Sequence, residues 1–276
     1  MRHRHAGHRP TFLALGDSIT DGGHAERSYR FHLHRLLTRA GHVDVRWSGS
    51  MRGVFDHASG SRANASHGLL VHGRPEWPPS AQGHEGHWGW TSLDVLRGHK
   101  RQRQRGKLSV WLGSTPRPDV VLLHLGTNDL TKLVARDGEP VRETARRIEE
   151  IVGQLCVASP RVRVVVASPI PYCRFRSNRV DPTAPAKLQL RRKREATLAQ
   201  LLRDMVANPT DLAASCRRRA RLAYVNMSAS VGCEHLFKDG VHPAAAGAER
   251  MAAAWFAALE PLVLPMPPHG WAAVNE

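Results

Sequence analysis

Short polar segments of the chain contain side chains that together could carry out acyl transfer. Ser18 lies in "LALGDSITDGG", Asn128 lies in "GTNDL", and Asp239 and His242 lie in "KDGVHP". A serine hydroxyl becomes a nucleophile when a histidine takes its proton, and a carboxylate bonded to the imidazole fixes the tautomer of that histidine. These residue types predict Ser18 as the nucleophile, His242 as the base and Asp239 as the acid that orients the base.

The same segments offer N–H donors for an oxyanion hole. Negative charge develops on the carbonyl oxygen during acyl transfer, and preorganised donors stabilise it. The candidates are the backbone N–H of Ser18, the backbone N–H of a glycine in "GHEGHWGWTS" (83–92) and the side-chain amide of Asn128. Asp17, which precedes the serine, is expected to support the turn rather than to take part in the chemistry.

The segment "KDGVHP" suits a carboxylate and an imidazole that face each other. Gly240 allows the chain to bend between Asp239 and His242, because glycine adopts conformations closed to other residues. Pro243 disfavours the helical conformation at His242 and so keeps this residue in the loop before the last helix. We expect the bend to bring Asp239 back onto the imidazole.

Each of these residues also has a structural explanation. Serine is common in turns, Asn128 and Asp129 can form an ordinary turn pair, and Asp239 can cap the last helix. His242 is one of 17 histidines. Taken singly, each residue favours a structural role. Their joint occurrence, in this order and at the ends of expected strands, favours catalysis.

Apolar segments with strand character alternate with amphipathic segments along the chain. Strands are expected at 11–15, 43–49, 119–125, 161–171 and 221–227, and helices at 27–40, 91–98, 139–156, 185–206 and 243–259. Residues 50–90 are rich in Gly, Ser, His and Pro and are expected to form a long loop region. The alternation predicts a three-layer α/β fold with a mainly parallel sheet, in which functional residues gather at the carboxyl ends of the strands.

The composition limits the kinds of partner that the chain can have. It has 276 residues, 41% of them hydrophobic, and a formal net charge of +16. Much of the positive charge lies in the segments 97–107, 191–195 and 216–221. Because no nucleic-acid-binding motif accompanies these segments and no aromatic residues are interleaved with them, we expect no specific nucleic-acid partner.

The cysteines and the N-terminus carry weaker signals. Cys156, Cys173, Cys216 and Cys233 form no C-x-x-C pair, so no metal or redox motif is indicated, and whether they pair stays open. The basic segment "MRHRHAGHRP" is followed by "TFLAL", which is too short for the apolar part of a signal peptide. No segment suits a membrane span. The sequence as written is expected to be cytoplasmic, or secreted if the true start lies upstream, and it indicates no oligomeric state.

The motifs resemble those of the SGNH, or GDSL-type, hydrolases. "GDSIT" with Ser18, "GTND" with Asn128, and "DGVH" with Asp239 and His242 look like the first, third and fifth sequence blocks of that family. The resemblance implies a flavodoxin-like α/β/α sandwich. It also implies ester hydrolysis through an acyl-serine intermediate, without a metal or another cofactor.

The second block of that family is represented by "GHWGWTS". The resemblance points to Gly89 as the oxyanion glycine, with Gly86 as the alternative. It runs over about residues 11–260, which are expected to form the hydrolase domain, so that residues 1–10 and 261–276 are expected to be terminal extensions.

A narrower likeness concerns the substrate. "HEGHWGWTS", "PDVVLLHLGTNDL", "IPY" and "KDGVHP" are similar to carbohydrate esterase family 3, whose members include acetyl xylan esterases. This implies removal of acetyl groups from a carbohydrate such as acetylated xylan. Trp90, Trp111 and Tyr172 are either walls of a sugar site or core residues.

Other functions fit the same residues. A broad-specificity esterase, a lysophospholipase or a thioesterase could use the same catalytic groups. The non-enzymatic alternative is a basic polyanion-binding protein that keeps a vestigial site, since the chain carries a net charge of +16.

Overall fold

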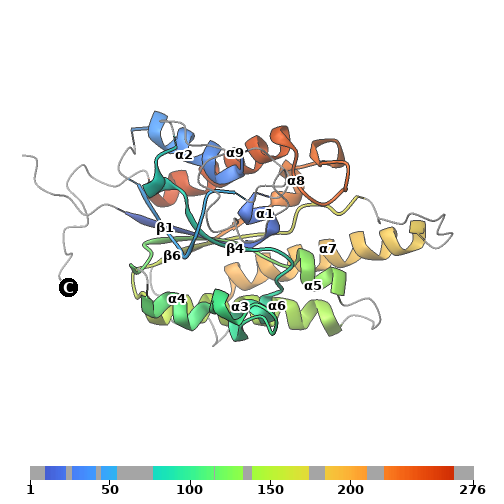
Figure 1. Ribbon diagram of the computed structural model, residues 1–276. Helices are drawn as coiled ribbons and strands as arrows, with labels where there is room; N and C mark the ends of the chain where they lie inside the picture. The colour runs from blue at the N-terminus through green and yellow to red at the C-terminus, as the bar shows by residue number, and fades with distance from the viewer. Residues whose placement is uncertain are drawn as a thin grey trace, which may run out of the picture.

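A β-sheet runs through the middle of the computed structural model, with helices on both of its faces (Figure 1). The structure describes residues 10–22, 27–41, 45–54, 77–114, 116–132, 139–173, 184–209 and 221–263. The strands are β1 (Thr11–Asp17), β2 (Arg46–Ser48), β3 (Met51–Arg52), β4 (Gly83–His87), β5 (Val120–His124), β6 (Arg163–Ala167) and β7 (Leu222–Val225). Their order is β3-β4-β1-β5-β6-β7, and β2 pairs with the first half of β1.

The strand pairing brings the expected site segments to one edge of the sheet. The pairings among β1 to β7 are parallel except the one between β3 and β4. Gly16 on β1 lies opposite Gly86 on β4 and opposite His124 on β5. The carboxyl ends of these neighbouring strands therefore lie side by side, which confirms the prediction of a mainly parallel sheet.

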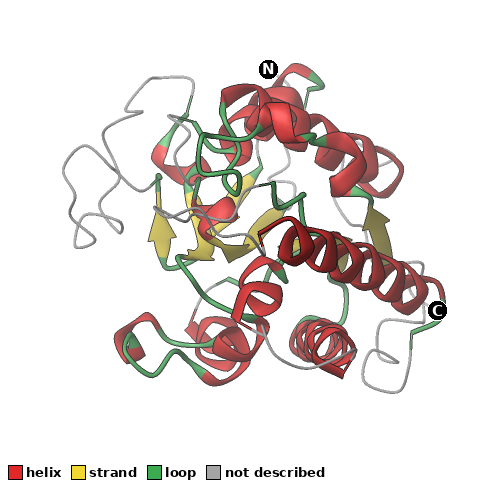
Figure 2. Cartoon of the chain, turned by 90° about the vertical axis from the view of Figure 1, so that its right-hand side faces the viewer, coloured by secondary structure: helices red, strands yellow, loops and turns green. Residues whose placement is uncertain are grey.

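The helices form two layers. They are α1 (Ser18–Asp21), α2 (Tyr29–Arg39), α3 (Ser92–Arg97), α4 (Leu108–Ser114), α5 (Thr127–Lys132), α6 (Glu139–Ala158), α7 (Ala184–Ala207), α8 (Met227–Ser230) and α9 (Ala245–Val263). In Figure 1, α2, α8 and α9 lie above the sheet, and α3, α4, α5, α6 and α7 lie below it. Figure 2 shows the strands enclosed between the two layers. The expected α/β/α sandwich is confirmed.

Both faces of the central strands are buried, because successive side chains of a strand point to opposite faces. On β1, Phe12 and Ala14 belong to the core that includes residues of α2 and α9. Leu13 and Leu15 belong to the other core, which includes residues of α3, α4, α6 and α7. This double burial explains why β1, β5 and β6 appear in the sequence as nearly continuous apolar runs.

The expected helices 27–40, 91–98, 139–156, 185–206 and 243–259 correspond to α2, α3, α6, α7 and α9. Thr91 caps α3: its hydroxyl accepts from the N–H of Asp94, and the Asp94 carboxylate accepts from the N–H of Thr91. Four short helices of the described ranges, α1, α4, α5 and α8, were not predicted.

The prediction of a long loop region over residues 50–90 was wrong for part of that range. β3, a 3₁₀ turn at Pro79–Ala81 and β4 lie within it, whereas residues 55–76 fall outside the described part of the chain. β4 has the sequence GHEGH and is buried at every position. It escaped prediction because it contains no apolar side chain, so the hydrophobic pattern that marks buried strands is absent.

The cysteine pairing left open by the sequence is partly resolved. Cys173 and Cys233 form a disulfide, and Cys156 is disulfide-bonded as well.

None of the helices in the described ranges combines the length and apolarity that crossing a bilayer requires.

Candidate active site

Ser18, His242 and Asp239 form one hydrogen-bonded chain. His242 Nδ1 lies 2.6 Å from Asp239 Oδ2, and His242 Nε2 lies 2.9 Å from Ser18 Oγ. Because Nδ1–H donates to the carboxylate, Nε2 is left as the acceptor for the Ser18 hydroxyl. The structure thus brings together a serine at the end of β1 and an acid–base pair in the loop before α9.

The loop that carries the acid and the base is bent as the sequence predicts. Gly240 has a φ of +68°, a conformation that favours glycine. Asp239 Oδ1 accepts from the backbone N–H groups of Val241 and His242, each at 3.0 Å. Burial alone would raise the pKa of Asp239, but the hydrogen bonds from His242 and Val241 hold that pKa well below its ordinary value. The carboxylate is therefore ionised at neutral pH.

Asn128 connects the other segments of the site. It lies in the first turn of α5, just after β5. Its side-chain Nδ2 donates to the backbone oxygen of Trp90 at 3.0 Å and to Asp17 Oδ2 at 3.3 Å. Asp17 Oδ1 also accepts from the N–H of Ile19 at 2.9 Å and so caps α1. Asp17 supports the turn, as expected, and ties it to Asn128.

Asp129, the neighbour of Asn128, fixes α5 against α3. Its carboxylate accepts from the backbone N–H and from the hydroxyl of Ser92, with the latter bond at 2.5 Å. Asp129 is buried, and burial raises its pKa, although the Ser92 hydrogen bonds oppose that rise. Asn128 thus stands on a helix whose start is anchored to the first residue of α3.

The two candidate oxyanion glycines lie in different surroundings. Gly86 is inside β4, where its N–H donates to His84 Nδ1 at 3.0 Å, and a Cβ atom there would lie 2.5 Å from the backbone nitrogen of Asp21. Gly89 lies in the turn after β4 with a φ of +73°, and a Cβ atom there would meet nothing within 4 Å. Gly86 thus allows α1 to approach β4 closely, and Gly89 faces open space.

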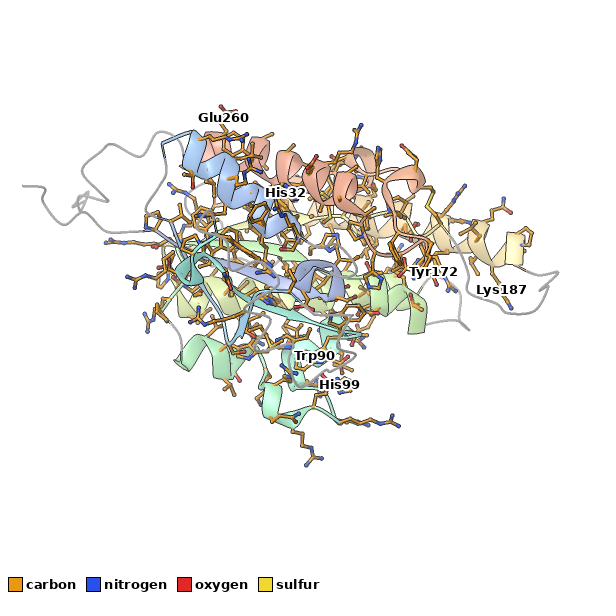
Figure 3. The ribbon with its side chains drawn as sticks, turned by 45° about the horizontal axis from the view of Figure 1, so that its top comes forward. His32, Trp90, His99, Tyr172, Lys187 and Glu260 are labelled. Atoms are coloured by element: carbon orange, nitrogen blue, oxygen red, sulfur yellow. A yellow bond between two sulfur atoms is a disulfide. The ribbon has the colours of Figure 1, made fainter. Side chains whose placement is uncertain are left out.

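For two of the tryptophans the structure decides between the two roles that the sequence left open. Trp90 and Trp111 are 0% and 3% exposed and belong to the core below the sheet, so neither is a wall of a sugar site. Figure 3 shows Trp90 beside His99, and their rings stack at a centroid distance of 5.9 Å. Tyr172 is half-buried, with the guanidinium of Arg191 4.8 Å from its ring centre.

Sequence reasoning missed Trp88. This half-buried residue precedes Gly89, and its indole ring stacks on the His242 imidazole with a centroid distance of 5.0 Å. Its indole N–H donates to Asp21 Oδ2. The signal that could have found it was its place beside the predicted oxyanion glycine.

A buried polar network supports β4. The Glu85 carboxylate accepts from the backbone N–H of Ser50 at 2.5 Å and from the Ser50 hydroxyl at 2.9 Å. It also forms a hydrogen bond with His87 Nε2 at 2.8 Å. The His87 ring stacks on those of Trp90 and Trp111. These contacts satisfy polar groups that would otherwise be costly to bury, and they fix the strand that leads to Gly89.

Arg30 is buried beside α1. Its guanidinium donates to the backbone oxygens of Thr20 and Asp21 at 2.8 and 3.0 Å, to Gln82 at 3.0 Å, and to Gly53. Burial lowers the pKa of Arg30 to about 10, while it raises the pKa of Asp21 to about 7. Burial likewise raises the pKa of Asp17 to about 7. The buried Arg30 guanidinium thus fixes the end of the helix that begins with Ser18.

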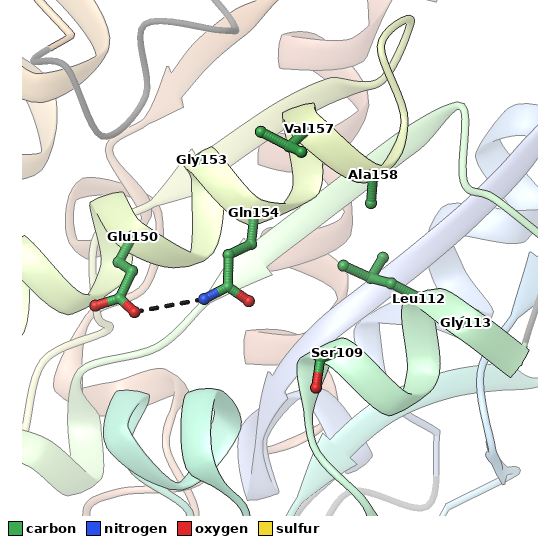
Figure 4. A pocket seen from close by; sticks show the side chains of 8 residues that line it. All are labelled: Ser109, Leu112, Gly113, Glu150, Gly153, Gln154, Val157 and Ala158. Carbon is green, nitrogen blue, oxygen red and sulfur yellow. Dashed lines mark hydrogen bonds between the residues drawn. The ribbon is translucent and has the colours of Figure 1, made fainter.

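One groove lies away from these residues. It has a volume of about 540 Å³ and lies between α4 and α6, lined mostly by small and apolar side chains (Figure 4). None of the candidate site residues lines it.

Within the described ranges, no three His, Cys, Asp or Glu side chains gather as metal ligands would.

Comparison with known proteins identifies the family and the fold of the chain. The profile of the GDSL-like lipase/acylhydrolase family matches residues 14–250. No curated protein matches the sequence. Among solved structures, the fold is similar to a family 3 carbohydrate esterase of Clostridium thermocellum, with 20% identity, a TM-score of 0.61 and coverage of 92% of this chain and 97% of the other.

Two further structures show the same fold. A family 3 carbohydrate esterase of Talaromyces cellulolyticus has 22% identity and a TM-score of 0.60, with 94% of this chain and 100% of the other covered. Est24, a carbohydrate acetylesterase of Sinorhizobium meliloti, has 16% identity and a TM-score of 0.59, with 92% and 100% covered.

Proposed function

Because the chain belongs to the GDSL-like lipase/acylhydrolase family, we propose that it is a serine esterase that hydrolyses short-chain esters, above all acetyl esters of carbohydrates. The observation that carries this proposal is the continuous chain from Asp239 through His242 to Ser18, with contacts of 2.6 and 2.9 Å. A nucleophile, a base and an orienting acid in hydrogen-bond reach are what acyl transfer through serine requires.

In the proposed acylation step, Ser18 Oγ attacks the ester carbonyl carbon while His242 Nε2 takes the hydroxyl proton. The imidazolium keeps its bond to Asp239, whose carboxylate is ionised and 2.6 Å away. His242 then gives the proton to the departing alcohol oxygen, and the acyl group remains on Ser18. Water then repeats the sequence: it loses a proton to His242 and attacks the acyl carbon. His242 returns this proton to Ser18 Oγ as the carboxylic acid leaves, and Ser18 is free again.

The oxyanion is held by three N–H donors in this proposal. The backbone N–H of Ser18 is the first in α1, where no intrahelical carbonyl can accept from it. Gly89 supplies the second donor, supported by its place in the turn after β4, whose last residue, His87, lies opposite Asp17 at the end of β1. Asn128 supplies the third: its bond to Trp90 is kept, and the substrate oxygen replaces Asp17 as the acceptor of the hydrogen on the longer contact.

The substrate class rests on different support. The solved structures with this fold that are named above are those of carbohydrate esterases or acetylesterases. Together with the resemblance of "HEGHWGWTS" and "KDGVHP" to carbohydrate esterase family 3, this favours an acetylated carbohydrate over a long-chain lipid.

The disulfides bear on where this esterase acts. Cys173 is bonded to Cys233, and Cys156 is bonded too. Structural disulfides persist mainly in oxidising compartments. We propose that the protein acts in such a compartment, which favours secretion over the cytoplasm.

The test compares wild type with Ser18→Ala on 4-nitrophenyl acetate. We expect the variant to lose roughly 10³-fold or more in kcat, because only oxyanion stabilisation and binding remain. Ser230→Ala is the matched control, since that hydroxyl is exposed and donates to the backbone oxygen of Asn226. Equal rates for wild type and Ser18→Ala contradict the proposal.

A second assay chooses among substrates. Acetate release from acetylated xylan is compared with fatty-acid release from a lysophospholipid at matched ester concentrations. Faster acetate release supports the carbohydrate assignment, and faster fatty-acid release favours the lysophospholipase instead. If the wild-type protein hydrolyses neither ester but binds a polyanion, this favours the non-enzymatic alternative.

A further inference from the structure

We propose that Trp88 is a positioning residue that keeps the His242 imidazole aligned with Ser18, and that Asp21 anchors it. This inference deepens the proposed function and rests on it for the catalytic consequence. It starts from a pair of contacts made by one side chain: the Trp88 indole stacks on His242, and its N–H donates to Asp21 on the helix that begins with Ser18.

The stack removes the freedom that the hydrogen bonds leave. His242 is bonded through Nδ1 to Asp239 and through Nε2 to Ser18. Two bonds at opposite sides of a ring still allow the ring to tilt about the line that joins them. The Trp88 ring covers one face of the imidazole at 5.0 Å between centroids, with an interplanar angle of 29°, and blocks that tilt. Offset aromatic pairs of this kind are attractive as well as space-filling.

Trp88 is itself held in place. Its N–H donates to Asp21 Oδ2, and the Asp21 side chain is fully buried at the end of α1. The backbone oxygen of Asp21 accepts from the guanidinium of Arg30, which is 0% exposed. The base is therefore tied, through one indole ring, to the four-residue helix that carries the nucleophile.

Core packing does not account for Trp88. Trp47, Trp77, Trp90, Trp111 and Trp255 are each 3% exposed or less and belong to a hydrophobic core, whereas Trp88 is half-buried and belongs to neither core. It stands next to Gly89 in the turn between two buried residues, His87 and Trp90. A large aromatic side chain at this place is explained by its contacts with His242 and Asp21.

The experiment measures kcat and KM for 4-nitrophenyl acetate in three variants. In Trp88→Leu, which removes the ring, we expect kcat to fall roughly 10- to 100-fold and KM to change by less than about 3-fold, because misalignment of a catalytic group affects the chemical step. In Trp88→Phe, which keeps a ring and loses the N–H, we expect a fall of roughly 3- to 10-fold. Trp47→Phe is the control: Trp47 Nε1 has no hydrogen-bond partner in the structure.

A second readout does not depend on hydrolysis. The indole ring current shifts the ring protons of His242 upfield in the proton NMR spectrum, so Trp88→Leu moves them downfield while Trp47→Phe leaves them in place. The same spectra show whether each variant is folded. If Trp88→Leu does not fold, Trp88→Met, which also removes the ring, carries the kinetic test, and a kcat equal to that of wild type in folded Trp88→Met overturns the inference.

The outcomes separate this inference from the proposed function. Full activity in Ser18→Ala contradicts the proposed function, and the NMR shift of His242 still reports on Trp88. Inactive Ser18→Ala together with fully active, folded Trp88→Leu overturns the positioning role alone. A kcat of Trp88→Phe equal to that of wild type overturns the anchoring by Asp21.

Discussion

The backbone N–H of Cys173 donates to the backbone oxygen of Gly240 at 2.8 Å. Gly240 lies between the candidate acid and the candidate base, and Cys173 is covalently bonded to Cys233, which lies at the start of the same loop. The segment after β6 is thus fastened to the Asp239–His242 loop by one hydrogen bond and one disulfide.

Removing this disulfide is expected to lower both stability and activity. In Cys173→Ser/Cys233→Ser the closed loop, with a sequence separation of 60, is opened. The free energy of unfolding should fall by about 2–4 kcal/mol, because the unfolded chain regains conformational freedom. We expect kcat to fall as well, since the loop that holds His242 is less constrained. Urea unfolding and 4-nitrophenyl acetate kinetics measure the two effects. An unchanged unfolding midpoint and slope contradict the prediction.

Asn128→Ala tests the side-chain donor. We expect kcat to fall roughly 10²- to 10³-fold with little change in KM, because an oxyanion donor acts mainly in the transition state. The control is Asn226→Ala in the segment before α8, where the side-chain oxygen accepts from Ser228 at 2.8 Å. Similar kcat values for Asn128→Ala and wild type exclude Asn128 from the oxyanion hole.

Alanine substitutions separate the two glycines. In Gly86→Ala the new Cβ meets the backbone nitrogen of Asp21 at 2.5 Å, so we expect the free energy of unfolding to fall by about 1–3 kcal/mol. In Gly89→Ala the Cβ enters open space, and only the φ of +73° is unfavourable, which costs about 1–2 kcal/mol. We expect kcat to fall more in Gly89→Ala than in Gly86→Ala, although Gly89→Ala is the less destabilised variant. Thermal unfolding and kcat are measured for both variants. A larger fall of kcat in Gly86→Ala than in Gly89→Ala favours Gly86 as the donor.

Asp21 should make the stability depend on pH. Burial raises its pKa from 3.8 to about 7, so the folded protein binds this proton more tightly than the unfolded chain does. Its contribution to stability is complete below about pH 4 and is lost as the pH rises through about 7. Asp21→Asn cannot ionise, so its stability relative to wild type should increase between pH 5 and pH 8.

The measurement is urea unfolding of both proteins across that pH range. Asp94→Asn, which changes the capping residue of α3, is the control for substitution of a carboxylate outside this cluster. A constant difference between Asp21→Asn and wild type shows that Asp21 does not titrate between pH 5 and pH 8.

Much of the fold is visible in the sequence because β1, β5 and β6 are buried on both faces. Their apolar runs could be recognised without a partner, as could the apolar stripe of α6, where Ile148, Ile151 and Leu155 are 1% exposed or less. β4 could not be recognised in this way. Its burial depends on hydrogen bonds from Ser50 and on contacts that exist only after the chain has folded.

The candidate site shows the same division. Ser18, Asn128, Asp239 and His242 stand out because their residue types suit acyl transfer and because each follows or precedes a recognisable element. Trp88 has no such mark, since its significance lies in a ring contact with a residue far along the chain. Trp90 and Trp111 looked equally suited to a sugar site, and only their burial shows that they are core residues.

Ser18 and His242 are separated by 224 positions in the sequence, yet one hydrogen bond joins them. Neither the first nor the last part of the chain can therefore assemble the site by itself. The proposed mechanism needs both residues, so we expect that cutting the protein between them creates two fragments that are inert alone and that regain ester hydrolysis only when they reassemble. Under that mechanism, activity reports that both parts of the chain have folded together, which makes the chain a natural starting point for a split-enzyme sensor.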